Sequence, residues 1–280
     1  MPSPTEISVS QLSRLIGLPD APVVIDICLD EDFAEDPRLV PSSFRHPFDT
    51  IGELASSLQC RRVVLVCQKG LKLSQGSAAV LRDHGIAAEF LGGGVVAWRD
   101  AGLPMIPAGR IPNLNAEQRS VWVTRQRPKI DRIACPWLIR RFIDPRAQFL
   151  FVAPSQVMNV AEKFSATPFD VEGVLWSHRD DLCTFDTMIK EFCLETEPLK
   201  RLAVIIRGAD TDRHDIAPQS AGLMAASLGL SRMYRDDLSQ LEAGMGLYDA
   251  FYRWARDAFN EGHDWPVHSS RPTEDRDGQQ

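Results

Sequence analysis

The sequence has 280 residues, of which 44% are hydrophobic and 25% charged; this is typical of a soluble globular protein, and the length suits two domains better than one. Its formal net charge of -7 gives no reason to expect a nucleic acid or an anionic membrane as partner. No window approaches about 18 consecutive apolar residues, so we expect no bilayer-spanning helix and no membrane partner.

The N-terminus and the cysteines indicate a cytoplasmic protein. The first ten residues contain neither the basic nor the apolar region of a secretory signal. The cysteines are scattered without a CxxC pair, at positions 28, 60, 67, 135, 183 and 193. A disulfide framework is not expected in a chain of this length, so we predict reduced thiols and a cytoplasmic location.

The first predicted elements are a strand, an acidic turn and a helix. Residues 22–27 are apolar and β-branched and predict a buried strand that ends in Asp26. Residues 28–33 form an acidic turn that opens a short element. Residues 51–58 have apolar side chains at helical spacing, which predicts a helix.

The next stretch leads from a strand directly into a cysteine. Residues 63–66 predict a buried strand, Cys67 follows it, and residues 75–84 predict a helix after a short loop. Backbone N–H groups at the start of that helix, together with Lys69 and Lys72, favour the thiolate form of Cys67. The alternative is a structural cysteine of the core. The strand, loop and helix context favours a reactive cysteine.

The following elements complete an alternating pattern. Residues 86–91 predict a strand, and the glycines at 92–94 predict a turn with positive φ. Residues 95–100 predict a short helix that carries Trp98 and ends before Gly102 and Pro104. Because strands alternate with helices, we predict an α/β fold with a parallel sheet.

This first region resembles a rhodanese-family sulfurtransferase domain. The resemblance is carried by residues 24–27 with Phe33, 64–70, 78–85, and 91–94 through Trp98 to 102–104. It implies a rhodanese-like parallel-sheet domain in which Cys67 is the nucleophile that carries a persulfide sulfur. Asp26 would order the site from the first strand. The loop that would hold the anionic substrate comprises Gln68, Lys69, Gly70, Leu71, Lys72 and Ser74.

Three positions depart from the family pattern. Cys28 stands where the family often has arginine, and Lys72 stands where the loop usually has arginine. Leu73 displaces the expected serine by one position, to Ser74. Sulfur transfer and the handling of a larger oxyanion therefore both remain open.

We predict the first domain over 5–107 and a linker over 108–119, because residues 105–119 contain two prolines and little periodicity. A second, α+β and mainly helical domain is predicted over 120–268, and a polar, disordered tail over 269–280.

The second domain opens with a strand over 121–125 and an arginine-rich segment. Asp131 is expected to N-cap a helix that contains Pro136 in its first turns. The basic side chains suggest an anion site, since guanidinium forks match oxyanions; they are Arg125, Lys129, Arg132, Arg140 and Arg141. The alternatives are a solvated face with ion pairs to Asp144 and a DNA-contacting helix.

Two further strands are predicted over 147–152 and 173–178. His178 and Cys183 flank an acidic turn, and His214 lies in a later aspartate-rich stretch, so these three could ligate a transition metal. The alternative is that the histidines are structural or surface groups. No cofactor is firmly implied.

The remaining chain predicts two helices. Residues 217–230 are rich in alanine, leucine and methionine, with Pro218 in the first turn. Residues 236–259 carry a long apolar stripe that we assign to the core.

The second region resembles the chromate resistance protein family (ChrB). The resemblance is carried by residues 127–144, Ser177–His178 with residues 183–186, residues 207–211, residues 247–250 and Arg253–Trp254. It implies an association with chromate resistance or chromate-responsive control.

Three functions follow from these observations. The first is persulfide transfer through Cys67 coupled to chromate resistance, with a small sulfane-sulfur donor or an oxyanion (thiosulfate, chromate) as partner. The second is a chromate-responsive transcriptional regulator; DNA is not favoured as partner, because no helix-turn-helix pattern stands out. The third is an oxyanion-binding or metal-binding protein with a non-catalytic rhodanese-like domain. The oligomeric state is not indicated.

Overall fold

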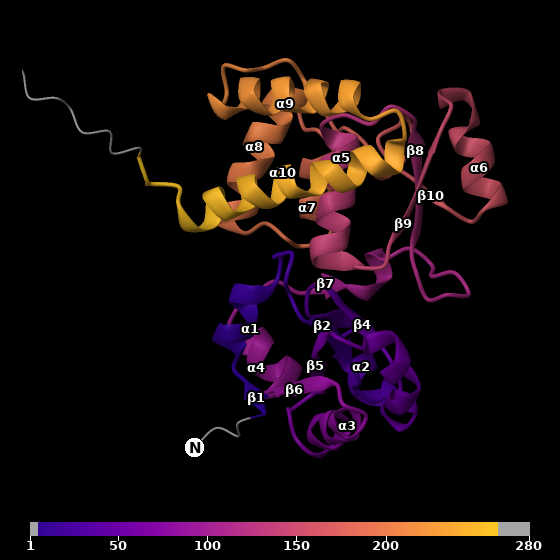
Figure 1. The fold of residues 1–280 in the computed structure, drawn as a ribbon, viewed down its shortest axis with the longest axis vertical. Coiled ribbons are helices and arrows are strands. Elements are labelled where there is room, and N and C mark those ends of the chain that lie inside the picture. Colours follow the sequence, from indigo (N-terminus) through magenta and orange to yellow (C-terminus); the bar gives the residue numbers. More distant parts are fainter. Residues whose placement is uncertain (1–4, 263–280) are drawn as a thin grey trace, which may run out of the picture.

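The computed structural model describes residues 5–262. The N-terminal half contains a five-stranded sheet in the order β1-β6-β5-β2-β4, and every neighbouring pair in it is parallel (Figure 1). The strands are β1 (Glu6–Ile7), β2 (Val23–Asp26), β4 (Ser43–Arg45), β5 (Arg62–Val66) and β6 (Ala87–Leu91). The predicted parallel α/β sheet is confirmed.

Helices cover both faces of this sheet. They are α1 (Val9–Leu15), α2 (Asp30–Glu35), the 3₁₀ helix η1 (Phe48–Leu58), α3 (Lys72–Asp83) and α4 (Gly94–Asp100). Side chains of β5 alternate between the two faces: Val63 and Leu65 pack in one apolar cluster, whereas Val64 and Val66 pack in another. A strand buried on both faces needs this continuous β-branched run.

Two predicted helices differ in detail. Residues 51–58 belong to a longer 3₁₀ helix instead of an α-helix, with Ile51, Ala55 and Leu58 buried. Helix α3 begins at Lys72, three residues before the predicted start. The end of the loop therefore already belongs to the first helical turn.

The residues on both sides of the start of the predicted linker form regular structure. Strand β7 (Ile106–Pro107) pairs antiparallel with β3 (Arg38–Leu39), and the short 3₁₀ helix η2 (Ala108–Arg110) follows. Met105 and Ile106 are buried. These two apolar side chains anchor the end of the first predicted domain in the core, just before the linker.

The C-terminal half is mainly helical and contains a small parallel sheet in the order β10-β8-β9. Its strands are β8 (Val121–Arg125), β9 (Gln148–Val152) and β10 (Thr167–Pro168). The helices are α5 (Asp131–Leu138), the π-helix η3 (Ile139–Ile143), the 3₁₀ helix η4 (Pro154–Gln156), α6 (Val157–Lys163), α7 (Thr184–Glu191), α8 (Glu197–Asp210), α9 (Gln219–Met233) and α10 (Asp237–Asp257).

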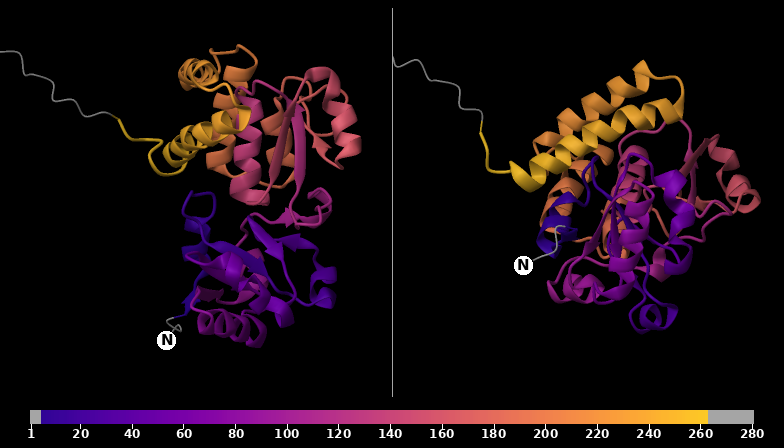
Figure 2. Two further views of the ribbon diagram at one scale, coloured as in Figure 1. Left: turned by 45° about the vertical axis from the view of Figure 1, so that its right-hand side comes forward. Right: turned by 60° about the horizontal axis from the view of Figure 1, so that its bottom comes forward.

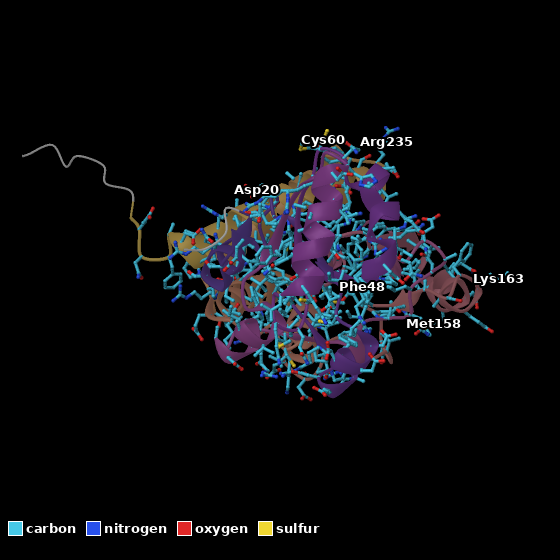
Figure 3. All side chains as sticks on the ribbon, turned by 90° about the horizontal axis from the view of Figure 1, so that it is seen from below. Asp20, Phe48, Cys60, Met158, Lys163 and Arg235 are labelled. Atoms are coloured by element: carbon cyan, nitrogen blue, oxygen red, sulfur yellow. The ribbon has the colours of Figure 1, made fainter. Side chains whose placement is uncertain are left out.

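Helix α6 lies on one side of this sheet, and α5 with α7, α8 and α10 lies on the other (Figures 1 and 2). Met158 and Lys163 of α6 project from the periphery of the molecule in Figure 3, and Met158 is 57% exposed. The other face of α6 buries Val157 against Val121 and Val123.

Several predictions for this half are corrected. Residues 173–178 form turns and bends instead of a strand, with a single bridge between Phe169 and Trp176. The N-cap of α5 is Ile130, whereas Asp131 is the first helical residue. Pro218 precedes α9 as its N-cap instead of lying in its first turn.

The apolar stripe of α10 is core along most of its length. Leu241, Tyr248 and Ala255 are buried. The ends of the stripe are more open, because Leu238 is 48% and Phe259 43% exposed. Gly244 lets α10 approach α5 closely, since a Cβ there would lie 2.7 Å from Ile133 Cγ2. The predicted tail over 269–280 lies outside the described residues.

The two halves share one continuous apolar core, which includes Leu12 and Trp98 from the first half and Trp137 and Phe142 from the second. The Ser42 N–H donates to the Phe142 carbonyl at 2.6 Å. Among residues 5–262, we find no helix with the length and apolar character needed to cross a membrane.

Candidate functional site

Cys67 lies at the carboxyl end of β5, in the loop that leads into α3. Its side chain is 5% exposed, and its Sγ donates to Ser74 Oγ at 3.2 Å. The Ser74 hydroxyl in turn donates to the Leu71 carbonyl at 3.3 Å. Although Leu73 displaces this serine along the sequence, the early start of α3 brings its hydroxyl to the sulfur.

The backbone of the loop can bind an anion. Within residues 5–262, the N–H groups of Lys69, Gly70 and Leu71 donate no hydrogen bond. The N–H groups of the first turn of α3 are likewise without an intrahelical acceptor. Successive free N–H groups at a helix start attract negative charge. Lys69 and Lys72 are exposed at the same loop.

Two glycines set the shape of this loop. Gly94 has φ +61, and a Cβ there would lie 2.1 Å from the Cys67 carbonyl oxygen and 2.6 Å from the Gly70 nitrogen. Gly70 has φ +66, and a Cβ there would lie 2.4 Å from the Leu91 carbonyl oxygen. The turn before α4 therefore supports the cysteine loop through backbone contact that a side chain would prevent.

Asp26 lies beside the loop at the end of the adjacent strand β2, in register with Val66. It is 1% exposed, and its Oδ1 accepts the Cys28 N–H at 2.9 Å. Burial raises the pKa of Asp26, although the Cys28 hydrogen bonds and Arg45 oppose that shift. Burial, followed by the charge of Asp26, raises the pKa of the Cys28 thiol.

Arg45, which the sequence analysis did not single out, brings a guanidinium to this edge of the sheet. Its Nη2 donates to the Cys28 carbonyl at 2.8 Å and to Asp30 at 2.9 Å. Its position on β4, next to β2 in the sheet, follows from the strand order and was not visible in the local sequence.

A second group of titratable side chains lies in the C-terminal half. His178 Nε2 is 3.5 Å from Asp131 Oδ2, 3.4 Å from Asp170 Oδ1 and 3.2 Å from Asp210 Oδ2. Asp131 follows β8 and Asp170 follows β10, so both leave the carboxyl ends of neighbouring parallel strands. That edge is where open α/β sheets commonly bind ligands.

Three further groups hold these carboxylates. Arg125 Nη2 donates to Asp170 Oδ2 at 3.0 Å, and Arg132 Nε lies 3.3 Å from the same oxygen. The Thr184 N–H donates to Asp131 Oδ2 at 2.6 Å, and the Thr184 hydroxyl donates to Asp170 Oδ1 at 3.0 Å. The start of α7 thus bridges the two strand ends.

The cluster shifts the pKa values of Asp131, Asp170 and His178. Burial, followed by the charge of Asp210, raises the pKa of Asp131 to about 7. The three carboxylates, Asp131 foremost, raise the pKa of His178 to about 12. Burial opposes ionisation of Asp170, yet His178, Arg132 and Arg125 lower the pKa of Asp170. Perturbed groups of this kind concentrate at functional sites.

The predicted metal trio is not assembled. Asp131, Asp170 and His178 offer ligand atoms that all lie within 4.8 Å of one another, and no other such group of three occurs in residues 5–262. Cys183 is completely buried, and its N–H donates to Asp186 Oδ2 at 3.1 Å as α7 begins. His214 Nε2 lies 3.6 Å from Asp212 instead. Of the three predicted ligands, His178 alone joins the group.

The five basic residues predicted as one anion site are dispersed. Arg125 and Arg132 hold Asp170, while Arg140 Nη1 donates to Glu242 at 2.6 Å. Arg141 binds the Asp249 carboxylate through two hydrogen bonds of 2.8 Å, and Lys129 is exposed.

The alternative prediction, in which the arginines form ion pairs with Asp144, is wrong about the partner. Asp144 Oδ2 accepts the Ser120 N–H and hydroxyl, at 2.7 and 2.6 Å. The arginines are nonetheless paired, with acids from other elements.

Two of these arginines line a cavity between the halves. Its volume is about 350 Å³, and Arg140 and Arg141 line it together with Arg61, Arg146 and Glu242. With four guanidinium groups and one carboxylate, the charged side chains that line the cavity carry a net positive charge. Arg140 and Arg141 of the predicted anion site therefore line one cavity.

Comparison with known proteins relates the second half to one family. Residues 122–255 match the family model described as ChrB, C-terminal domain. The chain is 36% identical over 155 residues to Protein ChrB of Cupriavidus metallidurans; the match covers 54% of this chain. It spans 46%, about half, of the length of that relative.

The N-terminal half is similar to rhodanese-related structures. A rhodanese-like domain protein from Staphylococcus aureus is 28% identical; the match covers 34% of this chain and 90% of that one, with a TM-score of 0.30. A thiosulfate sulfurtransferase from Pseudomonas aeruginosa is 26% identical, with 37% and 19% covered and a TM-score of 0.33. A rhodanese-related protein from Thermoplasma volcanium is 19% identical, with 36% and 96% covered and a TM-score of 0.31.

Proposed function

We propose that the rhodanese-like half carries a sulfane sulfur as a persulfide on Cys67, and that the ChrB-type half links this chemistry to chromate resistance. The observation that carries the proposal is the position of Cys67. It stands at the carboxyl end of a buried parallel strand, before a loop whose N–H groups at Lys69, Gly70 and Leu71 have no acceptor in residues 5–262.

The first step is attack of the Cys67 thiolate on the sulfane sulfur of thiosulfate. A new S–S bond forms at Cys67 while the S–S bond of thiosulfate breaks, and sulfite leaves with the bonding electron pair. The loop N–H groups stabilise the persulfide anion, and the ammonium groups of Lys69 and Lys72 attract the incoming dianion. The Ser74 hydroxyl, 3.2 Å from Sγ, can rotate to donate to the thiolate.

The second step returns the enzyme to its starting state. A nucleophile such as cyanide attacks the outer sulfur of the persulfide, so thiocyanate forms and the Cys67 thiolate is released. The test is thiocyanate formation from thiosulfate and cyanide by the purified chain. We expect turnover by the wild type, and none by Cys67→Ser. Cys193→Ser, which changes an exposed thiol in the other half, should keep the wild-type rate.

Mass spectrometry provides an independent readout. After incubation with thiosulfate, the wild-type peptide that contains Cys67 should gain the mass of one sulfur atom, which a reducing agent removes. A wild-type protein that neither turns over nor gains sulfur with any sulfane donor would refute the proposal. Chromate tolerance of bacteria that express the wild type or Cys67→Ser then tests the link to chromate, and equal tolerance would separate the two halves functionally.

A second candidate function, the binding of a small oxyanion such as chromate, is supported by the arginine-lined cavity between the halves. Guanidinium groups bind tetrahedral oxyanions through paired hydrogen bonds. Calorimetric titration with chromate should give one saturable site that sulfate, an anion of the same shape, competes for. Arg61→Gln and Arg146→Gln should weaken it, whereas Arg213→Gln, at an exposed ion pair, should not. Absence of saturable binding to the wild type would eliminate this function.

DNA remains the partner that the regulator hypothesis requires. Arg125, Arg132, Arg140 and Arg141 are each paired with an acid, which leaves less free positive charge on this segment than its sequence suggested. A salt titration of DNA binding tests the hypothesis, because phosphate contacts give a steep salt dependence. No binding at low salt would exclude it.

A further inference from the structure

Three carboxylate oxygens converge on one imidazole nitrogen in the C-terminal half. His178 Nε2 lies 3.2 to 3.5 Å from oxygens of Asp131, Asp170 and Asp210. A ring nitrogen carries at most one proton, so it can donate one linear hydrogen bond and not three. Hydrogen bonding to His178 therefore does not account for all three oxygens. A metal ion that replaces the ring proton would bind Nε2 together with oxygens of Asp131 and Asp170, because these ligand atoms all lie within 4.8 Å of one another.

The distances themselves match a coordination sphere. Ligand atoms placed tetrahedrally at about 2.1 Å from a metal ion lie about 3.4 Å from one another. The separations of His178 Nε2 from the oxygens of Asp131, Asp170 and Asp210 are 3.5, 3.4 and 3.2 Å. The nitrogen of His178 is thus spaced from each of these oxygens as one ligand atom is from another around a metal ion, and Nε2 and the ligand oxygens of Asp131 and Asp170 all lie within 4.8 Å of one another.

Asp131 supplies a second, independent observation. Its side chain is completely buried, and its Oδ1 has no hydrogen-bond partner in the part of the chain that the structure describes. A buried carboxylate oxygen without a partner costs about 1–3 kcal/mol or more, so proteins retain one where something binds it. The other oxygen of this carboxylate, Oδ2, lies 3.5 Å from His178 Nε2, so a cation bound by both oxygens would give Oδ1 the partner that it lacks.

Groups outside the cluster hold the carboxylates in place. Arg125 and Arg132 engage Oδ2 of Asp170, which leaves Oδ1 turned to His178. The Thr184 N–H and hydroxyl bind one oxygen each of Asp131 and Asp170. Hydrogen bonds of this kind orient ligands in metal sites and also offset the surplus negative charge.

We propose that Asp131, Asp170 and His178 bind one first-row divalent cation, such as Mn²⁺, Fe²⁺ or Zn²⁺. Carboxylates favour the harder ions, and imidazole favours the transition metals, so a mixed set suits these ions more than Mg²⁺ or Cu⁺. The side chains of His178 and Asp210 are 40% and 19% exposed. The ion would therefore be reached from solvent and could keep water as a further ligand.

The site is independent of Cys67 and of the proposed sulfur transfer. The test uses the full chain after removal of metal with a chelator, and the probe is Mn²⁺ alone, followed by the loss of the electron paramagnetic resonance signal of the free ion. We expect one Mn²⁺ per chain, displaced by stoichiometric Zn²⁺. His178→Ala and Asp170→Asn should each lower the affinity by at least about tenfold.

His214→Ala is the matched control. His214 is 38% exposed, nearly the same as His178, but faces the single carboxylate of Asp212. This variant should bind Mn²⁺ as tightly as the wild type. The proposal is overturned if the wild type shows no saturable binding, or if His178→Ala and Asp170→Asn bind as the wild type does. Asp170→Asn keeps the shape of the side chain, and circular dichroism establishes that each variant is folded.

Discussion

Replacing Gly94 with alanine would place a methyl group against the backbone of the cysteine loop. The new Cβ would lie 2.1 Å from the Cys67 carbonyl oxygen and 2.6 Å from the Gly70 nitrogen. Real Cβ contacts essentially never fall below 3.0 Å, so the Cys67 carbonyl and the turn must separate by at least 0.9 Å, the difference between 3.0 and 2.1 Å. Both atoms belong to the backbone and cannot rotate away.

The expected loss of stability has two parts. Alanine at φ +61 costs about 1–2 kcal/mol, because its Cβ crowds the carbonyl oxygen in the left-handed region. Forcing extra volume into a packed site costs a further ~1–3 kcal/mol. We therefore expect Gly94→Ala to lower the free energy of unfolding by about 2–5 kcal/mol.

Gly102 offers a control in which the second part is missing. It has φ +68, and an added Cβ meets nothing within 4 Å among the described residues. Gly102→Ala should therefore cost about 1–2 kcal/mol. Urea unfolding of both variants measures the difference. Displacement of the cysteine by about 1 Å should also lower thiocyanate formation by about 100-fold in Gly94→Ala.

Equal stability of the two variants would refute the reasoning about close backbone approach, whatever the activity. If Gly94→Ala is destabilised as expected but retains the full rate of thiocyanate formation, the contact supports the fold without positioning Cys67. The stability result is independent of the proposed function, so failure of sulfur transfer would not obscure it.

Four further variants test other features of the structure. Gly246→Ala, in the exposed middle of α10, should raise the free energy of unfolding by about 1 kcal/mol. Gly244→Ala should gain less stability than Gly246→Ala, because its Cβ would lie 2.7 Å from the Ile133 side chain of α5. Equal melting temperatures of the two variants would show that α10 and α5 do not approach each other this closely at Gly244. Asp249→Ala removes the carboxylate that binds the Arg141 guanidinium through two hydrogen bonds. Urea unfolding should show a free energy of unfolding lower by about 3–5 kcal/mol, and a loss below about 1 kcal/mol would count against a structural role for this pair. Burial raises the pKa of Asp26, so the folded state favours the protonated carboxyl. Protonation of Asp26 therefore stabilises the fold fully below its ordinary pKa of 3.8, and this stabilisation is lost as pH rises through the pKa of the folded state. Asp26→Asn should thus be more stable than the wild type at pH 7, with a difference that shrinks as pH falls towards 3.8; a difference independent of pH would show that the charge is not the cause.

Local patterns predicted the elements that depend on local physics. The β-branched run of β5, the glycines before α4 and the apolar stripe of α10 each formed the predicted type of element. Cys67 was also placed correctly at a strand end before a helix, because chain connectivity alone decides that position. Element boundaries shifted by a few residues where caps and first turns depend on neighbouring segments, as at Asp131.

The predicted strand over 173–178 failed because side-chain packing outweighed strand propensity. Its apolar centre has strand-like composition, but Trp176 stacks on Phe192 at 4.6 Å, with 10° between the rings. The segment is recruited to the helical core by that contact, and it makes a single bridge to Phe169. A local pattern records that a side chain is apolar and does not record which partner will bury it.

The sequence by itself determined the position of Cys67, because a cysteine between a buried strand and a helix needs no distant partner to be placed there. Tertiary structure alone decided the other site. Asp131, Asp170 and Asp210 lie far apart in the chain, and each resembles an ordinary capping or surface acid. They meet around His178 because β8 and β10 are parallel neighbours and α8 ends beside them. Convergence of charges depends on strand order and helix packing, which periodicity and spacing do not encode.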